Sequence, residues 1–122
     1  MSKIYLVDDQ PISNFITKKL LEIEGYQGIV KDFTNPCEAM EFVSEDSDAI
    51  IFLDLNMPEM NGWEFLEMLQ SRNCRHRIII LTSSTSKIDV DKAKDYPAVI
   101  KYMVKPMNKQ KFSELSGLLK AS

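Results

Sequence analysis

Five polar side chains stand directly after short apolar runs, although they lie far apart along the chain. The first run is followed by Asp8 and Asp9, the third by Asp54, the fourth by Thr82 and the fifth by Lys105. If these runs are parallel strands, their carboxyl ends meet at one edge of the sheet, where open α/β sheets bind ligands. We therefore expect the five residues to form one site.

The three carboxylates of this set predict a metal site. Asp8, Asp9 and Asp54 would repel one another strongly in one small crevice unless a cation neutralised them. A hard divalent cation prefers oxygen ligands, and magnesium accepts a site with few protein ligands plus waters. We expect Mg²⁺ or Mn²⁺, with Asp9 and Asp54 as direct ligands and Asp8 bound directly or through water.

The same set fits covalent chemistry at phosphorus. Asp54 ends its strand, so it is the carboxylate best placed to attack a phosphoryl group and form an acyl phosphate. The metal would bridge this nucleophile and the phosphoryl oxygens. The flexible ammonium of Lys105 suits a second phosphoryl oxygen, and the hydroxyl of Thr82 suits a third.

Each residue also has a structural explanation of its own. Taken alone, Asp9 is more simply a cap for a helix that begins near Pro11. Asp54 could belong to a polar turn, Thr82 could end a strand and Lys105 could be a solvated charge. These explanations suffice one at a time, but they do not explain why four such residues meet at one sheet edge.

The elements that must position these residues alternate along the chain. Near-continuous apolar runs predict strands over residues 4–7, 29–33, 49–53, 77–81 and 99–104. Such runs are typical of strands that are covered by helices on both faces. Helical patterns separate the runs, so the order is that of an α/β fold with a parallel sheet between helices.

Five helical segments are expected between and after the strands. The first begins near Pro11 and ends before Gly25, with an apolar stripe formed by Ile12, Phe15, Ile16, Leu20 and Ile23. The second begins at Asn35-Pro36, the third lies around residues 63–69 and the fourth around residues 88–94. The last is capped by Asn108 and turns inward Phe112, Leu115, Leu118 and Leu119.

Composition narrows the class of protein. A chain of 122 residues, with 44% hydrophobic and 27% charged residues, is typical of one compact domain rather than of a disordered or fibrous protein. The net charge of −3, without a Lys/Arg-rich stretch, argues against nucleic acid or a membrane as the main partner. The apolar runs are too short to cross a bilayer, so we expect a soluble, cytoplasmic protein.

Three other side chains receive plain interpretations. Cys37 and Cys74 match neither a metal spacing nor a disulfide framework, and we interpret them as reduced thiols. His76 is the one histidine, and none of the predicted site residues is near it in sequence. We interpret it as a solvated loop residue rather than a phosphate carrier.

The motifs around the site resemble those of the receiver family of two-component signalling, the CheY-like domains, over essentially the whole chain. In the family's order, the chain carries Asp8-Asp9, Asp54-Leu55-Asn56-Met57-Pro58 with Gly62 beyond, Leu81-Thr82-Ser83 and Lys105-Pro106. The resemblance implies a doubly wound, flavodoxin-like (βα)5 fold with strand order 2-1-3-4-5 and helices on both faces. It also implies that residues 1–122 are one receiver domain without an output domain, as a monomer or a weak phosphorylation-linked dimer.

The resemblance further implies a role for each site residue. Asp54 matches the phosphoacceptor, and Asp8 and Asp9 match the acidic metal site, whose shell the backbone carbonyl of Asn56 completes. Thr82 and Lys105 match the groups that bind the phosphoryl oxygens. Tyr102 matches the aromatic residue that changes rotamer when the threonine moves toward the phosphate, and the Lys105-Pro106 bond is expected to be cis.

One segment departs from the family pattern. Where a Gly-Ala pair usually precedes the fifth strand, this chain has Tyr96-Pro97-Ala98-Val99, and the interval from Thr82 to Lys105 is one residue longer than expected. A difference from the family is therefore expected in the fourth helix and its following loop. The register also leaves Ser83 as an alternative to Thr82 for the phosphate-binding hydroxyl.

The leading expectation for function is a signalling switch. It would accept a phosphoryl group from a sensor histidine kinase or a histidine phosphotransfer protein and then bind a downstream protein target. Its only catalysis would be its own phosphorylation and dephosphorylation, so it would not be an enzyme in the usual sense. The alternative is an interaction module that works without phosphorylation, which the complete set of site residues argues against. A metabolic phosphatase is disfavoured because Asn56 supplies no second acid and 122 residues leave no room for a cap domain.

Overall fold

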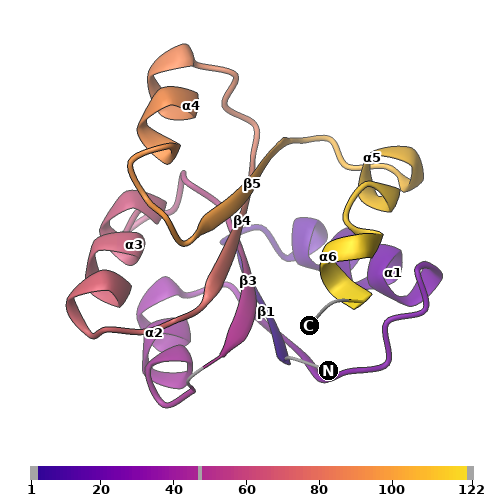
Figure 1. Cartoon of the computed structure of the whole chain (residues 1–122), viewed down its shortest axis with the longest axis horizontal. Helices are drawn as coiled ribbons and strands as arrows, with labels where there is room; N and C mark the ends of the chain where they lie inside the picture. Colours follow the sequence, from indigo (N-terminus) through magenta and orange to yellow (C-terminus); the bar gives the residue numbers. More distant parts are fainter. Residues whose placement is uncertain (1–2, 47, 121–122) are drawn as a thin grey trace.

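The sheet has five parallel strands in the order β2-β1-β3-β4-β5, as expected (Figure 1). The computed structural model describes residues 3–46 and 48–120. The strands are β1 (Lys3–Val7), β2 (Val30–Phe33), β3 (Ala49–Leu53), β4 (Arg77–Thr82) and β5 (Val99–Val104). Each predicted strand is present, with its ends within one residue of the prediction.

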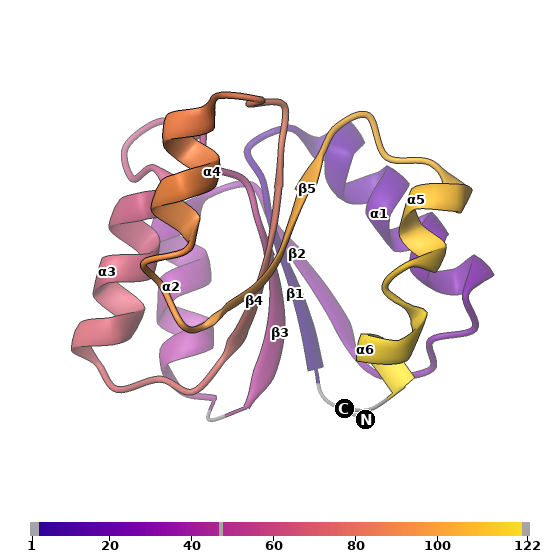
Figure 2. The same cartoon turned by 45° about the horizontal axis from the view of Figure 1, so that its top comes forward.

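Helices cover both faces of this sheet. They are α1 (Pro11–Ile23), α2 (Pro36–Ser44), α3 (Gly62–Ser71), α4 (Lys87–Ala93), α5 (Lys109–Ser113) and α6 (Ser116–Lys120). In Figure 2, α1, α5 and α6 lie on one side of the sheet, and α2, α3 and α4 lie on the other. The fold is therefore the doubly wound α/β arrangement. Within the described chain, none of these helices has the length and apolar character needed to cross a membrane.

Alternating strand residues supply the two cores. Ile4 and Leu6 pack with residues of α1, α5 and α6, whereas Tyr5 and Val7 pack with residues of α2 and α3. Every residue of β3 is buried, because this strand lies between two others and is covered on both faces. The near-continuous apolar runs in the sequence have this origin.

The predicted apolar stripe of α1 is wrong, although the helix itself is confirmed. Most of the stripe is exposed: Ile12 by 63%, Phe15 by 55%, Ile16 by 41% and Ile23 by 57%. The face that packs on the sheet instead carries Asn14, Thr17, Leu20 and Leu21. The pattern misled because two polar residues lie on the buried face, and an apolar set lies on the outer one.

The end signals of the helices act largely as expected. Asn35 accepts hydrogen bonds from the backbone N–H groups of Cys37 (2.8 Å) and Glu38 (3.3 Å), and Asn108 accepts one from that of Lys111 (2.8 Å). Gly25 follows the end of α1 with a φ of 80°, a conformation that glycine adopts without strain.

The last helix was predicted as one segment but is two. α5 ends at Ser113 and α6 begins at Ser116. Serine and glycine have low helix propensity, and the break lies among Ser113, Ser116 and Gly117. The expected inward residues Phe112, Leu115 and Leu119 are nevertheless buried, whereas Leu118 is half-buried.

His76 is buried rather than solvated, so its interpretation was wrong. Only 3% of the residue is exposed. Its Nδ1 accepts a hydrogen bond from the backbone N–H of Ala49 (3.0 Å), and its Nε2 lies 2.7 Å from the carbonyl oxygen of Val43. These bonds fix the tautomer with the proton on Nε2 and tie the end of α2 to the start of β3. This histidine supports the amino edge of the sheet.

The opposite edge contains the point where the strand order reverses. The chain runs outward from β1 to β2 and then crosses back to β3, so β1 and β3 are neighbours. Their register aligns Val7 with Leu53, which places the following residues, Asp8 and Asp54, side by side. In open α/β sheets this is the position at which ligands bind.

Candidate functional site

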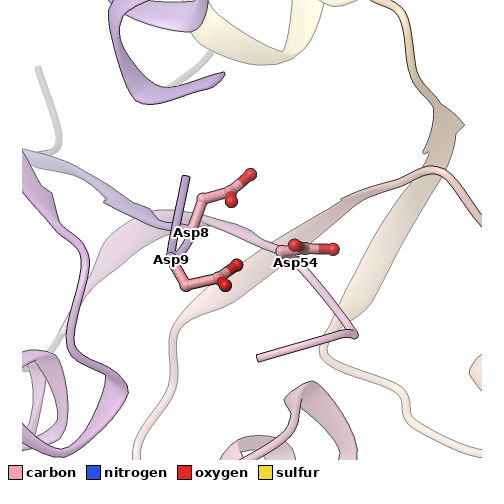
Figure 3. Close-up of side chains that lie close together, drawn as sticks. All are labelled: Asp8, Asp9 and Asp54. Carbon is pink, nitrogen blue, oxygen red and sulfur yellow. The ribbon is translucent and has the colours of Figure 1, made fainter. Parts of the chain in front are cut away.

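Three carboxylates gather at the reversal point of the sheet. One carboxylate oxygen from each of Asp8, Asp9 and Asp54 lies within 4.8 Å of the others (Figure 3). Asp8 and Asp54 are only 5% and 6% exposed, and Asp9 is half-buried. The sequence prediction that these residues meet at one edge is confirmed.

Backbone hydrogen bonds continue past the strand ends and hold the site residues in place. The N–H of Asp8 donates to the carbonyl oxygen of Phe33 (3.1 Å), and that of Asp54 donates to Val7 (3.0 Å). The N–H of Lys105 donates to the carbonyl oxygen of Thr82 (2.8 Å). The side chains therefore start from a rigid frame, which suits a site built on strand ends.

The helix cap offered as an explanation for Asp9 does not form. The residue before α1 is Gln10, and Asp8 rather than Asp9 binds its backbone, through a bond from Gln10 N to Asp8 Oδ1 (2.9 Å). Within the described residues, the Asp9 carboxylate accepts no hydrogen bond and pairs with no cation. Its half-buried charge faces the other two carboxylates without a protein partner.

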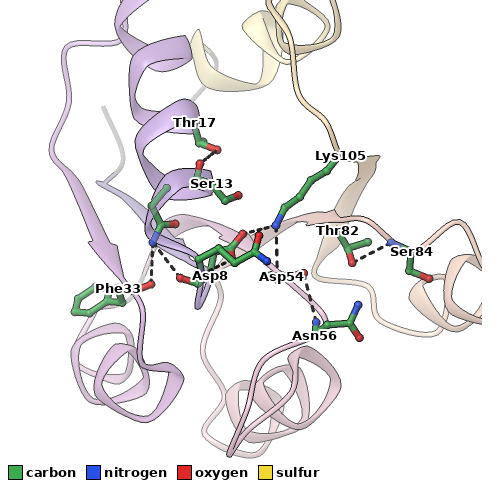
Figure 4. A network of polar contacts seen from close by, with 11 residues as sticks. Asp8, Ser13, Thr17, Phe33, Asp54, Asn56, Thr82, Ser84 and Lys105 are labelled. Carbon is green, nitrogen blue, oxygen red and sulfur yellow. Dashed lines mark hydrogen bonds and ion pairs between the residues drawn. The ribbon is translucent and has the colours of Figure 1, made fainter.

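Lys105 is the cation of the site. Its Nζ lies 2.6 Å from Asp8 Oδ2 and 3.6 Å from Asp54 Oδ2, with 17% of the side chain exposed (Figure 4). The peptide bond to Pro106 is cis, as the family resemblance implied. One lysine thus faces three carboxylates, so the pocket has an excess of negative charge.

The pKa of Asp54 reflects both its burial and this excess of negative charge. Burial raises the pKa of its carboxyl above the usual range, and the nearby charge of Asp8 raises it further. The ammonium of Lys105, the N–H of Asn56 (3.3 Å) and the hydroxyl of Thr82 all lower that pKa, but they do not outweigh burial and Asp8. A bound cation would favour the ionised form, which is the form able to act as a nucleophile.

The loop after Asp54 is held tightly against the site. The N–H of Gly62 donates to the carbonyl oxygen of Leu55 (2.9 Å), and Met57 inserts into the core. A Cβ on Gly62 would lie 2.7 Å from the backbone oxygen of Asp54, so a side chain there would force the backbone to move. Glu59 adopts a φ of 68°, which is uncommon for a residue other than glycine.

The structure places Thr82, rather than Ser83, beside Asp54. Thr82 is fully buried, and its hydroxyl is near enough to Asp54 to lower the pKa of that carboxyl, whereas Ser83 is exposed and lines a groove next to α1. The backbone N–H of Ser84 donates to Thr82 Oγ1 (3.3 Å). Of the two hydroxyls considered, only that of Thr82 therefore faces the phosphoacceptor candidate.

Tyr102 already contacts the loop that follows Thr82. Its hydroxyl donates to the carbonyl oxygen of Ser84 (3.0 Å), and its ring packs against the core. Ser84 Oγ in turn bonds to Asp89 in the first turn of α4 (2.6 Å). A chain of hydrogen bonds thus leads from Thr82, which lies beside Asp54, through Ser84 to both Tyr102 and α4.

The segment that departs from the family pattern packs on α3. Tyr96 stacks on Trp63 with ring centroids 5.6 Å apart, and its hydroxyl donates to Glu67 (2.6 Å). Lys92 of α4 lies 4.9 Å above the Trp63 ring. These contacts fix α4 and its following loop against α3, the helix that begins directly after the site loop.

Sequence reasoning missed one polar residue at the site. Asn14 is 3% exposed and donates from Nδ2 to the carbonyl oxygens of Asp8 and Phe33, each at 3.1 Å. The available signal was its position among apolar residues in the first helix, where the predicted stripe left it facing solvent. A buried amide needs hydrogen-bond partners, and here it finds them at the site.

The residues present fit a hard divalent cation. The donor atoms are oxygens, and the three carboxylates face only one lysine among the described residues. Asp9 has no protein partner in the same part of the chain. Asp9 and Asp54 would hold the ion, with Asp8 engaged by Gln10 and Lys105 in this structure.

Comparison with known proteins agrees with this architecture. The family model described as "Response regulator receiver domain" matches residues 4–115. A nitrate/nitrite response regulator homologue from Haemophilus influenzae is 33% identical over 72% of this chain and 42% of its own length. The transcriptional regulatory protein MalR from Bacillus subtilis is 30% identical over 92% of this chain and 47% of its own. The chain thus spans less than half the length of these relatives.

Solved structures show the same fold. The chemotaxis protein CheY4 of Vibrio cholerae is 26% identical, with a TM-score of 0.80 and 98% of each chain covered. A two-component response regulator from Cytophaga hutchinsonii is 24% identical, with a TM-score of 0.84 over 100% of this chain and 98% of its own. With the family model covering nearly the whole chain, this protein belongs to the response regulator receiver domain family.

Proposed function

We propose that this receiver domain is a signalling switch that accepts a phosphoryl group on Asp54 in the presence of Mg²⁺ or Mn²⁺. The observation that carries the proposal is the excess of negative charge at the reversal point of the sheet. Asp8, Asp9 and Asp54 lie together with Lys105 as the one cation bound to them among the described residues. A divalent cation would stabilise such a pocket by offsetting the charge of the carboxylates. Lys105 could then bind an anionic ligand.

The chemistry would be an in-line transfer to Asp54. Its carboxylate oxygen forms a bond to phosphorus while the bond from phosphorus to the donor's histidine nitrogen breaks, and that nitrogen keeps the electron pair. The metal, when bound, offsets the charge of the carboxylates and phosphoryl oxygens. Lys105 would leave Asp8 to pair with one phosphoryl oxygen, and the hydroxyl of Thr82 would donate to another.

The phosphodonor we propose is a sensor histidine kinase or a histidine phosphotransfer protein. A groove of about 300 Å³ opens beside Lys105 and is lined by Ile12, Ile16 and Met107. It continues onto the exposed apolar side of α1, where Phe15 is 55% exposed. A protein donor would find an apolar surface next to the acceptor. A cytoplasmic location follows from this proposal, since such donors present their phosphohistidine there.

Output would follow from the contacts of Thr82. A phosphoryl group that draws Thr82 closer would tighten the link through Ser84 to Tyr102 and α4, favouring the conformer with Tyr102 turned toward Ser84. We expect a coupling on the order of 1–3 kcal/mol, as is typical of allosteric effects. Beryllofluoride, a phosphate mimic, should shift amide resonances at Tyr102 and in α4; shifts confined to the site loops would contradict this route.

The test of the function itself uses acetyl phosphate as donor. With Mg²⁺, the protein should gain one phosphoryl group that hydroxylamine removes, and Asp54→Asn should gain none. Stable labelling of His76 or of a serine would contradict the proposal. A wild-type protein that stays unmodified with both acetyl phosphate and a histidine kinase would favour the alternative, an interaction module that works without phosphorylation.

A further inference from the structure

Asn14 connects the first helix to the loop that carries the acidic pair. Its side-chain Nδ2 donates to two carbonyl oxygens, those of Asp8 and Phe33, each at 3.1 Å. Both acceptors lie where β1 and β2 end, so one amide joins two strand ends to α1. Because the residue is 3% exposed, water cannot readily replace these bonds.

The bond to Asp8 holds the peptide that leads to Asp9. The carbonyl of Asp8 and the N–H of Asp9 belong to one planar peptide group. The N–H of Asp8 is itself bound to the carbonyl oxygen of Phe33 (3.1 Å). With Asp8 held on one side by Phe33 and on the other by Asn14, the direction in which the chain enters Asp9 is fixed.

Asp9 depends on this backbone more than its neighbours do. The carboxylate of Asp8 is held by Gln10 (2.9 Å) and Lys105 (2.6 Å), and that of Asp54 by the N–H of Asn56 (3.3 Å). In the described part of the chain, Asp9 has no such side-chain contact. Its carboxylate nevertheless lies within 4.8 Å of the other two, so main-chain placement is what brings it there.

Little free space lies between Asn14 and the carboxylates. The cavity that Asn14 lines together with Asp8 and Asp54 measures about 10 Å³, which is room for about one water molecule at most. The amide therefore packs directly beneath the site. Truncation would open space that water can enter and would free the carbonyl of Asp8.

We propose that Asn14 is a positioning residue for the metal site: it fixes the Asp8–Asp9 peptide so that the Asp9 carboxylate is directed toward a divalent cation. The inference rests on the proposed function, since that function requires the cation. It gives a role at the site to a residue of α1 that would contact neither the metal nor the phosphate. Partners that orient metal ligands typically change metal affinity by 10–100-fold when removed.

The test compares Asn14→Ala with Thr17→Val. Thr17 lies one turn further along α1 and is equally buried (2% exposed), but its hydroxyl donates only within the helix, to Ser13 (3.1 Å). Mg²⁺ is titrated while the fluorescence of Trp63 is followed, and hydrogen exchange of the Asp8 amide, which is bound to the carbonyl oxygen of Phe33, is measured in the metal-free protein. Asn14→Ser provides a second variant if Asn14→Ala does not fold.

Asn14→Ala and Asn14→Ser should weaken Mg²⁺ binding roughly tenfold and speed exchange of the Asp8 amide. Thr17→Val should bind Mg²⁺ within about twofold of wild type, even though it too loses a buried hydrogen bond. Equal Mg²⁺ affinity in wild type and the Asn14 variants, or equal weakening by Thr17→Val, overturns this inference alone. A wild-type protein that binds no Mg²⁺ overturns the proposed function as well.

Discussion

Neutralising the phosphoacceptor should stabilise the metal-free protein. At an effective dielectric constant of about 20, carboxylate oxygens of Asp8 and Asp54 at a separation of up to 4.8 Å repel by at least about 3.5 kcal/mol. Lys105, at 3.6 Å from Asp54, attracts it by about 4.6 kcal/mol. The carboxylate of Asp9 lies within the same distance and adds a repulsion of similar size, so the charges around Asp54 give a net repulsion. The cost of burying the Asp54 charge acts in the same direction. That cost is several kcal/mol per ion.

We therefore expect Asp54→Asn to raise the free energy of unfolding by about 2 kcal/mol at pH 7 without metal. For a domain of this size, Tm would rise by roughly 8 °C. The assay is thermal or urea unfolding in EDTA, with Asp91→Asn as a control that removes the same formal charge from an exposed site. Mg²⁺ should raise the Tm of wild type but not that of Asp54→Asn.

The pH dependence of stability provides a second check on the sign of this prediction. Because the folded-state pKa of Asp54 is raised, folding favours its protonated form, and this contribution is lost as pH rises through that pKa. The advantage of Asp54→Asn should thus be largest at neutral pH and shrink as the pH falls through the raised pKa. A variant that is less stable than wild type at pH 7 in EDTA would refute the charge-excess reasoning.

Three further predictions concern the support of the site and of the sheet. Gly62→Ala should lower stability by about 2 kcal/mol and slow phosphorylation by acetyl phosphate, because its Cβ would lie 2.7 Å from the backbone oxygen of Asp54; unchanged rates would contradict that contact. His76→Ala should cost about 2–3 kcal/mol in urea unfolding, since it leaves Ala49 N–H and Val43 C=O unpaired. Its Mg²⁺ affinity should stay at the wild-type value, because His76 lies at the opposite edge of the sheet. Glu59→Gly should stabilise by about 0.5 kcal/mol by relieving a φ of 68°, and a loss of stability would show that the Glu59 side chain matters more than its backbone.

The meeting of the site residues could be predicted because it depends on backbone topology. Apolar runs mark the strands, parallel strands end at one edge, and the residue after each strand is fixed by the order of the chain. Asp8, Asp54 and Lys105 therefore come together whatever the details of packing. The metal ligands and the phosphate-binding roles remain predictions, since they depend on groups that the chain must bind.

The errors have a common physical origin. The α1 pattern was assigned by the rule that apolar residues face inward, yet Asn14 and Thr17 are buried and Phe15 is exposed. His76 was judged by its neighbours in sequence, whereas its partners Val43 and Ala49 lie on other elements. A buried polar residue is stabilised by hydrogen bonds to segments distant in sequence, and a pattern within one segment carries no information on those segments.

The central claim is that Asp54 accepts the phosphoryl group, and reductive trapping tests it most directly. Protein incubated with acetyl phosphate and Mg²⁺ is treated with borohydride, which reduces an aspartyl phosphate to homoserine, and its peptides are then sequenced by mass spectrometry. We expect homoserine at position 54, dependent on Mg²⁺ and lost when EDTA is present. Homoserine at position 8 or 9, or none at any position while the protein still carries phosphate, would contradict the account.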